Sequence, residues 1–220
     1  MQSISTARSE SQILATNKVL KNTYALLSMT LLFSAAAAGV SMTLNLPPFG
    51  PIITLVGYFG LLFLTTKFRE SGLGILFVFM LTGFMGLTLG PILNLYLHLA
   101  NGSQLIMTAL GGTGVIFLAL SGYALTSRKD FSFMGGFLMV GILVAFLAGL
   151  GAMIFSMPAL SLAVSAMFIL LMSGMILYQT SEIIHGGETN YIMATVTLYI
   201  SLYNLFLSLL QILGALSNNR

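Results

Sequence analysis

The sequence predicts an all-α membrane protein whose chain crosses a lipid bilayer as seven helices. Only 6% of its 220 residues are charged, whereas a soluble globular domain carries about 25%. Hydrophobic residues make up 57% of the chain, and the charged residues gather in short clusters separated by long apolar stretches. A chain with so few charged groups cannot cover its surface with water-compatible side chains, so that surface must face lipid.

Four stretches contain no charged residue: 22–66, 71–127, 131–181 and 189–219. A membrane-spanning helix needs about 20 apolar residues, so each of the first three stretches can hold two spans and the last can hold one. The stretches are continuously apolar and lack the alternation of barrel strands, which favours helices. The seven predicted spans are 22–46, 50–66, 73–97, 104–126, 132–155, 159–181 and 191–213.

Each of the three long stretches is interrupted by residues that end a helix. Residues 47–51 (Pro-Pro-Phe-Gly-Pro) separate the first two spans, because no helix continues through such a segment. The polar turn 98–103 separates the third span from the fourth. Pro158 suits the first turn of a new helix and marks the start of the sixth span.

The charged clusters at 67–70, 128–130 and 182–188 predict the orientation. Each pair of spans returns the chain to the side it left, so these clusters lie on the side of the N-terminus. Seven of the eight Lys and Arg residues are on that side, and only Arg220 is on the other. The positive-inside rule therefore places the N-terminus in the cytoplasm.

Three regions follow from this topology. Residues 1–21 are a polar cytoplasmic tail, expected to be flexible with a short helix near residues 10–20. Residues 22–213 are the seven-helix membrane domain, and 214–220 are a short tail on the far side. The N-terminus also has features of a secretory signal, with Lys residues before an apolar run and small residues at 35–38. The apolar run continues well beyond those small residues, which favours an uncleaved first span.

Composition argues against several classes of function. The basic residues are too few and too scattered to follow the phosphates of a nucleic acid. The chain has no cysteine, so it forms no disulfide or thiolate metal site. The sequence contains no nucleophile–base arrangement, no His-Glu-x-x-His motif and no phosphate-binding Gly loop. We therefore expect neither an enzyme nor a protein with a bound metal or cofactor.

Small residues predict close helix packing on the third span. Gly86 and Gly90 lie four residues apart and share one helix face. In lipid, such a pair lets two helix backbones approach closely. The pair therefore predicts a tight helix–helix contact, without indicating a binding site.

The last predicted span carries a polar stripe. Its members recur every three or four residues and therefore share one helix face: Thr197, Ser201, Asn204, Ser208 and Gln211. A polar stripe that faced lipid would cost free energy, so we expect it to face the bundle interior. There it can form hydrogen bonds between helices, which is the commoner role, or line a polar path through the bundle.

The loop after the sixth span holds three titratable residues within a short distance, namely Glu182, His185 and Glu188. They could bind a cation, although their spacing matches no known metal motif. The alternative, which we favour, is a turn at 186–187 followed by a polar residue at 188–190 that caps the last helix.

Five segments resemble the Bax inhibitor-1 family, and the resemblance covers nearly the whole chain. They are 17–24, 89–94 (Leu-Gly-Pro-Ile-Leu-Asn), 128–133 (Arg-Lys-Asp-Phe-Ser-Phe), 183–191 (Ile-Ile-His-Gly-Gly-Glu-Thr-Asn-Tyr) and 198–206 (Leu-Tyr-Ile-Ser-Leu-Tyr-Asn-Leu-Phe). The resemblance implies a bacterial inner-membrane protein with six helices around a central seventh. The N-terminus would then be cytoplasmic and the C-terminus periplasmic.

The resemblance implies two candidate functions. One bacterial branch of the family modulates the membrane-bound AAA protease FtsH and its complex, as a binding partner or poor substrate that restrains it. Other relatives are pH-sensitive calcium leak channels that use two aspartates, one ending the sixth span and one within the seventh. Those positions correspond here to Gln179 and Ser201.

The loss of that acidic pair favours the protease modulator over the channel. Two close carboxylates respond to pH because they cannot both ionise cheaply, and neither Gln179 nor Ser201 can do this. Glu182 is the only nearby acid. If an ion path exists, we expect Gln179, Ser201 and Asn204 to line it, with Glu182 near its cytoplasmic mouth. The expected partners are the lipid bilayer and FtsH, with calcium only in the channel alternative.

Overall fold

The computed structural model describes the backbone of residues 2–218 and the side chains of residues 14–217. Within these residues every regular element is a helix, and there is no β-strand. The elements are α1 (Gln2–Thr43), α2 (Pro51–Lys67), α3 (Gly72–Leu97), α4 (Gly102–Ser127), the 3-10 helix η1 (Ser132–Met134), α5 (Gly135–Ile154), α6 (Pro158–His185) and α7 (Tyr191–Asn218). Each of the seven predicted spans corresponds to one α-helix.

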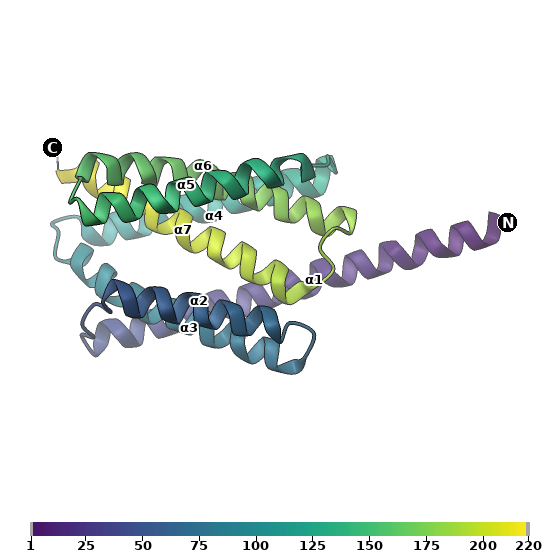
Figure 1. Ribbon diagram of the computed structural model, residues 1–220, viewed down its shortest axis with the longest axis horizontal. Coiled ribbons are helices and arrows are strands. Elements are labelled where there is room, and N and C mark those ends of the chain that lie inside the picture. Colours follow the sequence, from purple (N-terminus) through teal and green to yellow (C-terminus); the bar gives the residue numbers. More distant parts are fainter. Residues whose placement is uncertain (1, 219–220) are drawn as a thin grey trace.

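The helix expected near residues 10–20 is present and is longer than predicted, because the described part of residues 1–21 continues α1 from Gln2. No Gly or Pro interrupts the sequence between Gln2 and the membrane-spanning part of α1. Once a helix exists, each further residue adds one hydrogen bond without a new nucleation cost. The tail therefore extends the helix that the bilayer already requires, and in Figure 1 it projects beyond the bundle.

Six helices are long and apolar enough to cross a membrane, and α2 is a shorter apolar helix of 17 residues. At about 1.5 Å per residue α2 is about 26 Å long, close to the ~30 Å of a bilayer core. Ser34 approaches Gly86 while Ser41 approaches Gly90, so α1 and α3 run in the same direction. The chain between two parallel spans must return across the bilayer, and α2 is the segment that does so.

The helices form two groups with α7 between them. In Figure 1, α1, α2 and α3 lie together, α4, α5 and α6 lie together, and α7 crosses obliquely between the groups. α7 packs against α6, α4, α1 and α3 in decreasing order of contact, whereas α2 packs mainly on α3 and α5 on α6. Half of the membrane-spanning part of α7 is buried inside the protein, a larger share than in any other span.

The contact between α1 and α3 is the most extensive in the protein. A Cβ atom at Gly86 would collide with the carbonyl oxygen of Ser34, and one at Gly90 would collide with the Ser41 side chain. The close approach predicted for this glycine pair is therefore confirmed, with α1 as the partner helix. Glycine is required here because any side chain would push the two backbones apart.

A second feature of this contact compensates for Pro91, which lies inside α3. Proline has no N–H, so the carbonyl group of Leu87 loses its partner within the helix. The Ser41 hydroxyl of α1 donates to that carbonyl oxygen at 2.8 Å. Inside a bilayer an unpaired carbonyl group costs several kcal/mol. The bond from Ser41 of α1 removes this cost, so α1 compensates for the proline in α3.

The substitution Gly86→Ala tests the glycine contact. We expect it to lower the free energy of unfolding by about 1–3 kcal/mol, because the new methyl group meets backbone atoms that cannot move aside. Thermal unfolding in detergent measures the change. Gly39→Ala on α1 is the matched control, since no atom lies within 4 Å of the added Cβ. Equal melting of both variants and the native protein would contradict the proposed fit.

Candidate functional site

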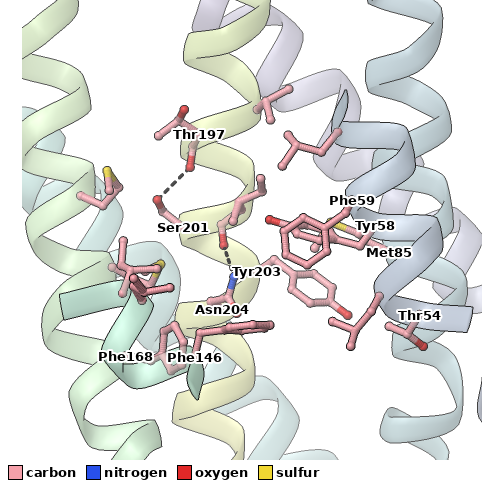
Figure 2. Close-up of a pocket in the computed structure, with 18 of the residues that line it drawn as sticks. Thr54, Tyr58, Phe59, Met85, Phe146, Phe168, Thr197, Ser201, Tyr203 and Asn204 are labelled. Carbon is pink, nitrogen blue, oxygen red and sulfur yellow. Dashed lines mark hydrogen bonds between the residues drawn. The ribbon is translucent and has the colours of Figure 1, made fainter. Parts of the chain in front are cut away.

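A cavity of about 660 Å³ lies between the two groups of helices. α2 and α3 line one side, α5 and α6 line the other, and α7 forms the floor (Figure 2). Most of the lining side chains are Leu, Ile, Phe and Met, and none of the described residues that line it is charged. The cavity is thus an apolar space within the membrane-spanning part of the protein, with a few polar groups in its wall.

The polar stripe of α7 faces the bundle interior, as predicted, but its two halves have different surroundings. Ser201 is only 1% exposed, and it lines the cavity together with Thr197 and Asn204. Further along the helix, the Gln211 side chain accepts a bond from the Ser165 hydroxyl of α6 at 2.7 Å. One half of the stripe therefore joins helices by hydrogen bonds, and the other half lines a cavity.

The polar groups on the cavity floor mostly bond within the protein. The Ser201 hydroxyl donates to the carbonyl oxygen of Thr197 at 2.8 Å. The Asn204 amide nitrogen donates to the carbonyl oxygen of Ile200 at 2.9 Å, and Figure 2 draws both bonds. These bonds satisfy the Ser201 proton and one of the two Asn204 N–H groups within α7 itself.

Tyr203 completes the same pattern across two helices. Its hydroxyl lies 3.1 Å from the Thr88 hydroxyl of α3. Thr88 uses its single proton to bond the carbonyl oxygen of Met85 at 2.7 Å, so Tyr203 is the donor in the first bond. One turn earlier, Tyr199 donates to the carbonyl oxygen of Thr82 and accepts from Ser34 of α1 at 2.6 Å. These two tyrosines fix α7 to α1 and α3.

The structure does not bring the four candidate path residues into one cavity. Ser201 and Asn204 line the cavity, and neither Gln179 nor Glu182 does. Gln179 is buried on α6, only 5% exposed. Glu182 lies at the end of α6, where its carboxylate lies against Gly187 of the following turn and its carbonyl oxygen accepts the backbone N–H of Gly187 at 2.9 Å.

A group of buried polar atoms without hydrogen-bond partners accompanies Gln179. They belong to Thr23, Tyr24, Ser121, Gln179 and Thr180. Thr23 and Tyr24 belong to α1, Ser121 to α4, and Gln179 and Thr180 to α6, and α6 packs against both α1 and α4. Apart from Gln179, sequence reasoning missed these residues, because single Thr and Ser residues in apolar helices usually bond their own backbone and give no distinct pattern.

The loop between α6 and α7 caps the last helix, as predicted. The Asn190 side-chain oxygen accepts the backbone N–H groups of Ile192 and Met193 at 3.0 and 3.1 Å. Its amide nitrogen donates to the carbonyl oxygen of Arg69 at 3.0 Å and to the Glu70 carboxylate at 3.1 Å. Asn190 therefore caps α7 and ties its start to the loop between α2 and α3.

His185 joins the same end of the molecule to α4. Its Nδ1 lies 2.9 Å from the carbonyl oxygen of Ser181, and its Nε2 lies 3.2 Å from that of Arg128. Nearby, the backbone N–H of Ser132 donates to the Asp130 carboxylate at 2.8 Å and lowers the pKa of Asp130, as does the charge of His185. In the part of the chain with described side chains, no three His, Asp or Glu residues are placed to share a metal ion.

The comparisons with known proteins decide the family. The sequence model described as "Inhibitor of apoptosis-promoting Bax1" matches residues 16–218. The chain belongs to the Bax inhibitor-1 family. This confirms the resemblance drawn from segments such as 89–94 and 183–191.

Three relatives are similar to the chain over most of its length. It is 54% identical over 98% of both chains to a protein of Escherichia coli K12 named "Modulator of FtsH protease YccA". It is 55% identical to an uncharacterized protein of Pseudomonas aeruginosa, over 89% of this chain and 88% of that one. A Vibrio cholerae protein named only as an uncharacterized membrane protein is 46% identical over 94% of this chain and 93% of its own.

The substitution Gln179→Met tests whether the buried amide of Gln179 destabilises the folded protein. Methionine has a similar length and no N–H group, so we expect the free energy of unfolding to rise by about 1–3 kcal/mol. Thermal unfolding in detergent measures it, with Gln104→Met, at an exposed site on α4, as the neutral control. A loss of stability at position 179 would mean that the amide is hydrogen-bonded, for example to internal water.

Proposed function

We propose that this chain restrains a membrane-bound FtsH protease, acting as a binding partner or a poorly degraded substrate. The observation that carries the proposal is the 54% identity, over 98% of both chains, to the E. coli protein named as a modulator of that protease. The chain would act by contact and would catalyse no reaction itself. It would occupy the inner membrane, as the name of a second E. coli relative indicates for that protein.

The projecting part of α1 supports this proposal. An ATP-driven protease that extracts membrane proteins must grip a segment outside the bilayer. In the described structure, the N-terminal part of α1 is the longest segment that extends beyond the bundle (Figure 1). The positive-inside rule places this segment, and the gripping machinery, in the cytoplasm and the C-terminus in the periplasm.

The packing of α1 supports slow extraction. A protease that pulls on the N-terminus meets α1 first, and α1 makes the most extensive helix contact in the protein, with α3. The bond from Ser41 to Leu87 and the bond between Ser34 and Tyr199 must break before α1 can leave. With α7 as the central helix of the bundle, loss of α1 would also expose the most buried span to lipid.

The calcium channel is the weaker alternative. No charged side chain lines the cavity among the described residues, and the positions of the family's acidic pair carry Gln179 and Ser201. The hydroxyl of Ser201 is already bonded to its own helix. A calcium ion prefers six to eight oxygen ligands, with carboxylates among them, and these residues supply no carboxylate.

Shortening the projecting segment tests the protease proposal. We expect deletion of residues 2–13 to lengthen the half-life of the chain severalfold in the presence of FtsH, because the protease loses the segment that it grips. Pulse-chase labelling measures the half-life, and membrane extraction checks that the protein still inserts. The control replaces residues 2–13 with a scrambled segment of the same composition, which should remain degradable. An unchanged half-life after deletion would refute the proposed grip.

A flux measurement tests the alternative. We expect proteoliposomes that contain the native protein to take up no more calcium than empty liposomes, because the cavity lacks carboxylate ligands. A calcium-sensitive dye inside the vesicles reports the uptake. Flux above the empty control that falls on Glu182→Gln would support the channel and count against the proposal.

A further inference from the structure

The cavity opens sideways toward the bilayer. The side chains at its outer edge are exposed: Phe59 of α2 by 50%, and Leu143 and Met139 of α5 by 57% and 73%. The side chains on its floor are enclosed, with Val196 and Ser201 of α7 each 1% exposed. Burial thus increases from the lipid-facing helices α2 and α5 inward to α7.

Little closes this opening. α2 and α5 are not among the helix pairs that pack against each other. The rings of Phe59 and Phe146 make an edge-to-face contact between them with centroids 6.2 Å apart, and both rings stand at the cavity in Figure 2. One such aromatic pair contributes about 0.5–1.5 kcal/mol of stability. The cost of separating the two rings to admit a molecule is therefore small.

The cavity is energetically unfavourable both when empty and when filled with water. Engineered apolar cavities of about 150 Å³ stay dry and bind benzene, and this one has about 660 Å³. An empty space of that size forfeits dispersion contacts along its whole lining. Water needs two to four polar partners, and the mostly apolar wall offers few, because the hydroxyls of Ser201 and Tyr203 and one N–H of Asn204 already bond within the protein. The remaining medium at this depth is hydrocarbon from the lipids themselves.

The dimensions and the side chains suit an acyl chain. The lining of α2 runs from Thr54 to Thr66, which at 1.5 Å per residue is about 18 Å. One leaflet contributes about half of the ~30 Å bilayer core, so the cavity is about as long as the hydrocarbon of a single leaflet. Several methionines line it, including Met139, Met175 and Met193, and their flexible thioethers adapt to a chain without fixed shape.

A basic residue directly follows the cavity lining at the end that adjoins the charged loops. Thr66 lines that end, and Lys67 follows it as the last residue of α2. The Lys67 ammonium lies over the Phe68 ring at 5.8 Å, and among the described side chains no acid pairs with it. Arg69, by contrast, is 3.4 Å from Glu70. Lys67 is therefore free to meet a phosphate at the membrane surface.

We propose that this cavity binds one acyl chain of an anionic phospholipid from the leaflet that adjoins the charged loops. The chain enters between α2 and α5, lies against α7, and leaves its phosphate beside Lys67. This site is independent of the proposed action on FtsH, so either proposal can fail without the other.

Photo-crosslinking tests the lipid site in the full-length protein. The protein is placed in phosphatidylcholine vesicles that contain a trace of phosphatidylglycerol with a diazirine on its acyl chain. After illumination, mass spectrometry maps the labelled residues. We expect labels on Thr197, Ile200 and Asn204 of α7, which the other helices shield from bulk lipid. A phosphatidylcholine probe with the same diazirine should label them about fivefold less, the effect of one basic residue near the surface.

Two pairs of variants sharpen the test. Ile200→Trp fills the cavity and should remove the α7 labels, whereas Leu118→Trp, on the exposed face of α4, should leave them unchanged. Lys67→Gln should make the two probes label equally. Lys21→Gln should keep the fivefold preference, because Lys21 lies on α1, which contributes no residue to the cavity wall.

Three results would overturn the proposal. They are the absence of α7 labels in the native protein, α7 labels that persist in Ile200→Trp, and equal labelling of the native protein by both probes. If Ile200→Trp does not fold, Phe59→Ala replaces it. This variant widens the opening and should increase the α7 labels, and a decrease would count against entry between α2 and α5.

Discussion

The structure depends on one constraint, which is that backbone N–H and C=O groups within the hydrocarbon must find their partners inside the protein. The constraint explains why the chain is helical along its apolar stretches. It also explains the details of the contact between α1 and α3. Pro91 leaves the Leu87 carbonyl without a bond, and Ser41 of the neighbouring helix supplies it. Ser41 can reach this carbonyl group because Gly90 has no side chain to keep α1 away.

The same constraint shapes the cavity beside α7. A polar stripe on a membrane helix can either join helices by hydrogen bonds or line a wet path. Here Ser201 and Asn204 are bonded to their own helix, and Tyr203 is bonded to Thr88. The wall that results offers little to an ion or a water chain and suits hydrocarbon. The chemistry of the stripe thus depends on where its hydrogen bonds go, and residue type alone does not reveal this.

The two proposals use opposite faces of one architecture. α1 is the helix that projects furthest from the bundle, and its contact with α3 is the most extensive between any two helices. A protease that pulls on the projection therefore works directly against that packing. α2 and α5, at the other side, are packed on only one main neighbour each and leave an opening toward lipid. One side of the bundle is thus closely packed, and the other side is open to lipid.

The sequence by itself determined the helices, because helix length and apolar character in a bilayer are local properties. It placed Gly86 and Gly90 in a close contact and predicted a helix cap in the loop that contains Asn190. Segments such as 183–191 also indicated the family. The tertiary structure decided which helix meets Gly86, which residues share the cavity, and that Gln179 and Glu182 do not line it. Those facts depend on how helices far apart in the chain pack and rotate against one another, and no local pattern specifies that arrangement.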